Sequence, residues 1–234
     1  MVEIKVSIGF FDKMGKSLSK ARLDSYKEEN GSEVDALRKY VWNTLLCESL
    51  YPGFQILEVS FRNSVHFQIG ETAKDPCWLS NQIGFLSDFE KEAIQKAKKS
   101  ISDRRGSVTE DYLVSEMSFG FWTSLLDKRY ETMWPKIIKA VLPNMPKTIR
   151  TRGDASKMMN TVRKLRNAAL HHHSIWHWKD LKEQHEKMIT LIGYICDSSA
   201  FLVSKIDRFP VVYALGYKNC GNFLGEIKLT TVTG

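Results

Sequence analysis

Residues 164–178 (KLRNAALHHHSIWHW) contain the side chains whose types and spacing are best suited to chemistry: Arg166, Asn167, His171 and His172. An arginine is a fixed cation for a phosphate, an amide can orient a phosphoryl oxygen, and a histidine exchanges protons near neutral pH. This set suits RNA cleavage in which the ribose 2′-OH attacks the adjacent phosphorus. A histidine would remove the 2′ proton or protonate the leaving 5′-oxygen, while arginine stabilises the developing charge. We expect 2′,3′-cyclic phosphate and 5′-OH ends, with no cofactor.

Helical geometry decides which of these side chains can meet. At about 100° per residue, Asn167 and His171 lie about 40° apart and share a face, whereas Arg166 lies about 140° from His171. The guanidinium of Arg166 must therefore curl over the turn, or reach a site that another element or another subunit completes.

A metal site is a second interpretation of the histidines. It needs three or four ligands converging on one ion. Only His173 and His177, four residues apart, could pair on a helix, with Asp180 or Glu183 as nearby carboxylates. Neither an H-E-x-x-H motif nor a Cys/His spacing is present. We therefore predict no metal.

A basic stretch leads into this segment, with seven cations and one anion between residues 145 and 166. Its position favours RNA binding, and the predicted RNA-binding residues are Lys147, Arg150, Arg152, Arg163 and Lys164. A structural interpretation remains for all these features. The charged stretch would then be a solvated face, Arg166 would form a salt bridge to a neighbouring helix, and the histidines with Trp176 would cap the end of their own helix.

The rest of the chain predicts the elements that position this segment. Helical periodicity indicates two long helices that meet at residues 51–53, a cationic helix over 87–101, and two shorter helices within 108–142. It then indicates a motif helix capped by Asp154 and a last helix over about 179–206. The sequence thus predicts an all-α antiparallel helical bundle.

The two ends of the chain have a different pattern. Residues 1–206 are predicted as one helical domain, in which residues 1–12 can form a strand because apolar residues alternate there. Residues 207–234 are predicted as a C-terminal extension. Its β-branched residues and a turn over 219–222 favour a β-hairpin, which the N-terminal strand could join.

Composition limits the partners and the compartment. The 34 Lys and Arg residues against 27 Asp and Glu give a formal net charge of +7, which favours anionic partners. The four cysteines form no C-x-x-C pair, and no apolar run approaches the length of a spanning helix. We therefore expect a reduced cytoplasmic protein without a membrane partner. A membrane-surface role would draw only on the positive charge.

The order of several blocks resembles a known family. R-N-x-x-x-H-H at residues 166–172, followed by Ile175-Trp176, resembles the signature of HEPN-domain proteins of the Abi-like group, which is linked to bacterial abortive infection. The blocks ARLDSYK (21–27), the Trp-Asn helix and Leu-Glu…Arg-Asn helix within 40–66, and the Phe-Gly-Phe-Trp segment within 113–134 follow in the same order. The resemblance covers about residues 20–205.

The resemblance implies a HEPN-like bundle that forms a homodimer, with a composite RNA site at the two-fold axis. By position, Arg166 and His171 match the catalytic pair, Asn167 the polar residue beside it, and His172 the second histidine. The implied protein is an antiviral defence or toxin-like ribonuclease, which a protein or RNA inhibitor could restrain. The tyrosine that nucleotidyltransferase antitoxins modify is absent, so we do not predict that modification. The alternative is a non-catalytic HEPN module that binds RNA or a protein partner.

A second cluster lies on the preceding long helix and comprises Glu58, Arg62, Asn63 and His66. Arg62 and His66 are four residues apart and share a helical face. The structural interpretation is an ionic network that ties this helix to the motif helix. The functional interpretation makes Glu58 or Arg62 part of the RNA site.

Overall fold

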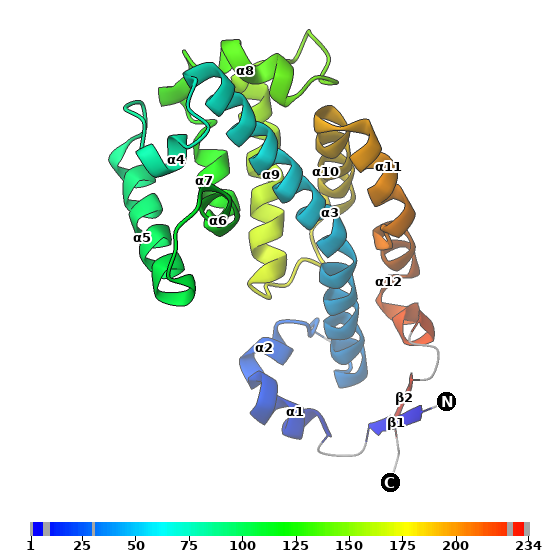
Figure 1. Cartoon of the computed structure of the whole chain (residues 1–234). Coiled ribbons are helices and arrows are strands. Elements are labelled where there is room, and N and C mark those ends of the chain that lie inside the picture. The colour runs from blue at the N-terminus through cyan, green and yellow to red at the C-terminus, as the bar shows by residue number, and fades with distance from the viewer. Residues whose placement is uncertain (1, 7–9, 30, 224–226, 232–234) are drawn as a thin grey trace. The chain divides into compact units, whose positions relative to one another are not determined.

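The computed structural model describes residues 2–6, 10–29, 31–223 and 227–231, and these are mainly helical (Figure 1). The predicted all-α helical bundle is confirmed. The chain divides into two compact units. Unit 1 contains residues 1–51, 167–185 and 207–234, and unit 2 contains residues 52–166 and 186–206.

Unit 1 contains both ends of the chain and the segment that carries the motif histidines. Its elements are strand β1 (Val2–Val6), α1 (Phe10–Leu18), α2 (Lys20–Asp24), the first part of α3 (Glu33–Ala73), the end of α9 (Arg152–Leu170), the start of α10 (Leu181–Ile195), α12 (Phe209–Phe223) and β2 (Ile227–Thr231). Buried Leu23, Tyr26 and Ala36 form a small core. Tyr40 and Trp176 pack against that core, so α2, α3 and the segment after α9 share one apolar cluster.

The C-terminal tail differs from its prediction. A helix, α12, covers most of the region where a β-hairpin was expected. The helix forms because Phe209 and Val212, three residues apart, are both buried, and Val212 accepts a hydrogen bond of 2.9 Å from the indole of Trp42. Among the described residues of the tail, β2 is the strand, and it pairs in parallel with β1, in the register Val2 with Ile227 through Val6 with Thr231. Strand β1 lies within residues 1–12, where a strand was expected, whereas helix α12 stands in place of the predicted hairpin. Cys220 lies outside the residues whose side chains are described.

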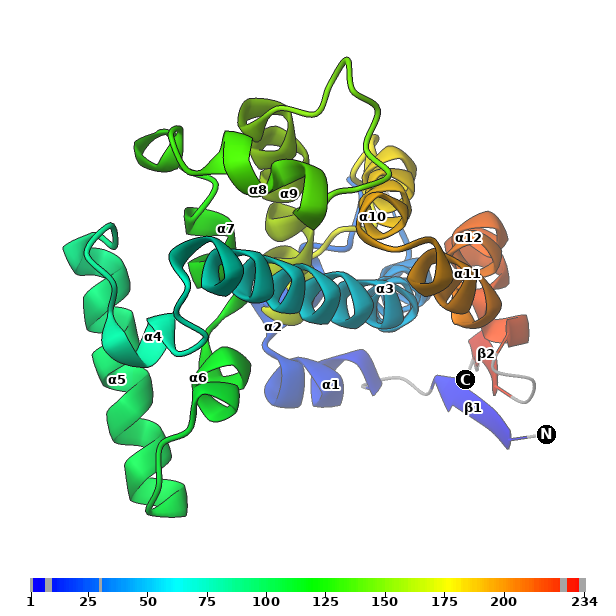
Figure 2. The same ribbon diagram turned by 45° about the horizontal axis from the view of Figure 1, so that its top comes forward.

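Unit 2 contains the rest of α3, then α4 (Trp78–Asn81), α5 (Asp88–Arg105), α6 (Glu110–Glu116), α7 (Phe119–Ser124), the 3₁₀ helix η1 (Lys128–Tyr130), α8 (Trp134–Val141), most of α9, the end of α10, and α11 (Asp197–Ile206). Helices α4, α5 and α6 pack together in both views (Figure 2). Trp78, Trp122 and Trp134 are fully buried, and the rings of Trp78 and Trp122 meet edge to face at 6.2 Å. Large aromatic side chains therefore supply much of this core.

The long helix α3 corrects another prediction. It continues through Pro52, where two helices were expected to meet. A proline inside a helix removes one backbone donor and opposes helical packing. Apolar side chains stay buried on both sides of it, including Leu50, Phe54 and Leu57. Packing along the whole helix thus outweighs the local preference of one residue.

Candidate active site

The motif helix α9 ends at Leu170, immediately before the three histidines. The amide of His172 donates to the carbonyl of Ala169 (3.2 Å), and that of His173 donates to the carbonyl of Ala168 (2.8 Å). These are the two bonds of a Schellman C-cap, with His172 at the left-handed position (φ +62°) that glycine usually occupies. The angle of about 100° per residue therefore does not apply to His172, because His172 belongs to the cap of the helix.

The histidines of the motif lie at the surface. His171 still donates its amide to the carbonyl of Asn167 at 2.9 Å, in the helical manner. His171, His172 and His173 are exposed, and Asn167 is half-buried. An exposed imidazole is accessible to a polymeric substrate, as a general base or acid requires.

The segment that follows the histidines is held by buried Asn43, which is 4% exposed. Its amide oxygen accepts hydrogen bonds from the amides of Ile175 (2.7 Å) and Trp176 (3.2 Å), and its amide nitrogen donates to the carbonyl of His173 (3.4 Å). The guanidinium of Arg22 donates to the carbonyl of His172. Two long-range contacts thus fix the backbone on which the histidines are mounted.

Trp176 anchors the same segment through its ring. The ring stacks on Tyr26 at 6.3 Å, and the ammonium of Lys39 lies 4.9 Å from its centroid. Lys39 is buried and pairs with Glu28 at 2.5 Å. In place of the predicted capping role, Trp176 packs on Tyr26, in the turn after α2, and on Lys39 of α3, at distances typical of aromatic and cation–π contacts.

In unit 2, Arg166 forms an ion pair with Glu58 of α3, with Nη2 and Oε2 3.3 Å apart. Both side chains are about a quarter exposed, at 26% and 21%. The pair links α9 to α3, as the structural interpretation of both motifs predicted. It also holds the guanidinium in place, which is what a phosphate-binding arginine needs.

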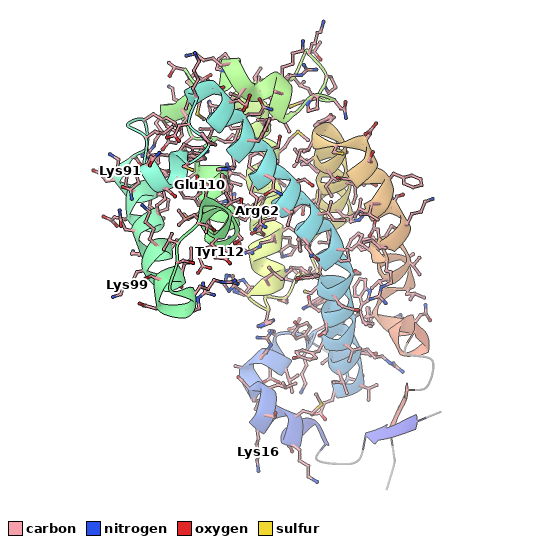
Figure 3. The ribbon with its side chains drawn as sticks, in the orientation of Figure 1. Lys16, Arg62, Lys91, Lys99, Glu110 and Tyr112 are labelled. Carbon is pink, nitrogen blue, oxygen red and sulfur yellow. The ribbon has the colours of Figure 1, made fainter. Side chains whose placement is uncertain are left out.

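The other residues of the second cluster have separate environments. Arg62 donates to the carbonyl of Ser115 on α6 at 3.5 Å, and Asn63 is exposed. His66 stacks on Trp78 at 5.6 Å and lies 3.9 Å from Glu110 (Figure 3 labels Arg62 and Glu110). Burial lowers the pKa of His66, and the nearby carboxylates oppose that shift only partly. A histidine that resists protonation is typical of a packed side chain.

The predicted RNA-binding cations divide into two groups. Arg150 donates to the carbonyl of Met145, and Arg152 pairs with Glu131 and donates to the carbonyl of Leu126 (2.6 Å). Arg163 donates to the amide oxygen of Asn160 on its own helix (3.0 Å). The two lysines of this set, Lys147 and Lys164, are exposed. Within unit 2, the arginines are thus bonded to protein groups and the lysines face solvent.

Within residues 2–6, 10–29, 31–223 and 227–231, no three His, Cys, Asp or Glu side chains come together as metal ligands would. None of the helices in the described part of the chain is both long enough and apolar enough to span a membrane.

Sequence reasoning missed Asn43 and Arg22. Both lie inside blocks that carried the family resemblance, the Trp-Asn helix and ARLDSYK. Their bonds to the motif segment span 132 and 150 residues. The order of the blocks was the available signal, because nothing local indicates partners so distant.

The fold and this segment define an all-α protein with an Arg-Asn…His-His motif at the end of a helix. Comparison with known families then gives a match to one described as Abi-like protein, over residues 8–177. That range covers more than half of the chain, so the protein belongs to the Abi-like family, as predicted. Searches of curated proteins and of solved structures found no match.

Proposed function

We propose that this protein is a metal-independent endoribonuclease of the HEPN type, acting as an abortive-infection effector. The observation that carries the proposal is the motif Arg166-Asn167-Ala168-Ala169-Leu170-His171-His172 at the end of α9, in a chain that belongs to the Abi-like family. The exposure of the histidines and the ion pair that positions Arg166 support it.

The chemistry requires only the substrate and these side chains. Neutral His171 removes the proton of a ribose 2′-OH, and the oxygen attacks phosphorus. The new P–O2′ bond forms as the P–O5′ bond breaks, and the 5′-oxygen leaves with a proton from the imidazolium or from water. Arg166 neutralises the charge that builds on the phosphoryl oxygens. DNA lacks the 2′-OH, so it stays intact.

In this proposal the protein acts as a homodimer. Asn167 orients a phosphoryl oxygen and His172 assists from the cap. The second copy brings its own motif to the two-fold axis, so that an arginine of one copy can serve the histidine of the other. Exposed Lys147 and Lys164 increase the attraction for RNA.

The test compares the wild type with Arg166→Ala and His171→Ala on mixed RNA in the presence of EDTA. The proposal expects cleavage by the wild type. Each variant should cleave at a rate lower by about 100-fold or more. Gln55→Ala, an exposed change on α3 outside both motifs, is the matched control and should cleave normally. Intact RNA with all proteins, while binding is retained, would instead favour the non-catalytic module.

A further inference from the structure

Two hollows in unit 1 share Arg22 and His172 in their linings. The first has a volume of about 430 Å³ and is bordered by Tyr40, Thr44 and Cys47 of α3 as well as by Arg22 and His172. The second, of about 450 Å³, is bordered by Tyr26 and Trp178 together with the same two residues. Both fall in the range of small-molecule sites. Arg22 and His172 therefore border two spaces of similar size.

The walls of these hollows suit an anion. No aspartate or glutamate is among the described residues that line either one. Burial raises the pKa of the Cys47 thiol to about 11 and that of Tyr26 to about 12, so both groups are uncharged near neutral pH. The charge of Arg22 opposes both shifts. The positive field of one arginine thus reaches the linings of both hollows.

Arg22 has donors left for a ligand. A guanidinium carries five N–H groups. In the described part of the chain, Arg22 makes one hydrogen bond, from Nη2 to the carbonyl of His172. The guanidinium carbon Cζ of Arg22 lies 6.0 Å from the centre of the Tyr40 ring. Partly exposed rings accompany this arginine, with Tyr40 at the first hollow and Trp178 at the second. An arginine beside such rings is a combination that binds single-stranded RNA, in which the cation takes a phosphate and the rings take bases.

We propose that Arg22 binds a phosphate of single-stranded RNA and that the two nucleotides flanking it occupy the first and second hollows. The identity of the ligand rests on the proposed function. His171 immediately precedes His172, which lines both hollows, so RNA bound here lies beside the motif. Arg22 then acts as a positioning residue for the substrate, in addition to supporting the backbone of His172.

The experiment measures binding without cleavage. A labelled single-stranded RNA is titrated against the His171→Ala protein and against the same protein carrying Arg22→Ala, Arg22→Lys or Lys20→Ala. Lys20 is exposed on the same short helix and lines neither hollow. Lys20→Ala therefore removes one positive charge, as Arg22→Ala does, but leaves both hollows unchanged. We expect Arg22→Ala to weaken binding about tenfold, and to reduce the salt slope of log K by about 0.7. The affinity of Arg22→Lys should lie between those of the parent protein and Arg22→Ala. Lys20→Ala should change the affinity by less than about twofold.

A second pair of variants tests the hollow itself at unchanged charge. Thr44 is exposed and lines the first hollow. Thr44→Trp fills that space and should weaken binding, whereas Thr44→Val keeps the space open and should not. Thermal melts check that every variant is folded.

The outcomes separate this inference from the proposed function. If Arg22→Ala binds RNA as Lys20→Ala does, or if the His171→Ala protein binds no RNA, the inference is overturned, and wild-type cleavage can still stand. If Arg22→Ala loses binding although the wild type cuts no RNA, the phosphate site stands and the ribonuclease proposal fails.

Discussion

Replacing Asn43 by alanine should release the segment that carries the motif histidines. The amide oxygen of Asn43 accepts from the backbone of Ile175 at 2.7 Å and of Trp176 at 3.2 Å, in a site where Asn43 is 4% exposed and Ile175 is fully buried. A buried N–H group left without its partner costs about 1–3 kcal/mol. Two such groups, one of them only partly buried, give a local loss of about 3 kcal/mol.

Hydrogen exchange of residues 171–178 measures this loss directly. Since 1.36 kcal/mol corresponds to a factor of ten, the amides of Ile175 and Trp176 should exchange roughly 100 times faster in Asn43→Ala. Asn43→Asp retains the acceptor and should fall between the two proteins. Asn63→Ala, exposed on the same helix, should leave the segment unchanged. Protection that survives in Asn43→Ala would refute the assignment of Asn43 as the support of the motif.

Three further residues and one mixing experiment test the rest of the account. His172→Gly should stabilise the protein by about 0.5–1 kcal/mol, because glycine adopts the left-handed cap position without strain; a lower melting temperature would contradict this. Glu58→Gln should destabilise by about 1–2 kcal/mol in urea unfolding, and a double-mutant cycle with Arg166→Ala should show coupling; additive losses would remove the ion pair from the account. His66→Gln should flatten the pH dependence of stability. The pKa of folded His66 lies below its ordinary value of 6.5, so the unfolded chain takes up the proton first and stability falls as pH drops below about 6.5; an unchanged slope would argue against it. Mixed Arg166→Ala and His171→Ala proteins should regain cleavage if one copy supplies the arginine and the other the histidine, whereas an inactive mixture would disfavour the composite site.

Sequence periodicity predicted the helices well where one face is steadily apolar. It failed at Pro52, because a local rule about proline was outweighed by burial on both sides of it. It failed again at α12, because the strand preference of β-branched residues is weaker than tertiary packing. Phe209 and Val212 are buried together on one face, which favours a helix.

The chemistry of the motif was readable from residue types, but its support was not. Nothing in three consecutive histidines predicts that His172 takes a position usually filled by glycine. The contacts of Asn43 and Arg22 join segments more than 130 residues apart, and no local pattern in the sequence indicates such partners. The Glu58–Arg166 pair was anticipated only as a network between helices, because helical spacing gives a shared face but no partner.

The measurement that tests the central claim most directly is the chemistry of the cut ends. RNA cut by the wild-type protein in EDTA would be analysed by mass spectrometry, beside His171→Ala as the inactive control. The account predicts 2′,3′-cyclic phosphates and 5′-hydroxyls that are absent from the control. Fragments with 3′-hydroxyl and 5′-phosphate ends, or cyclic phosphates that persist in His171→Ala, would contradict it.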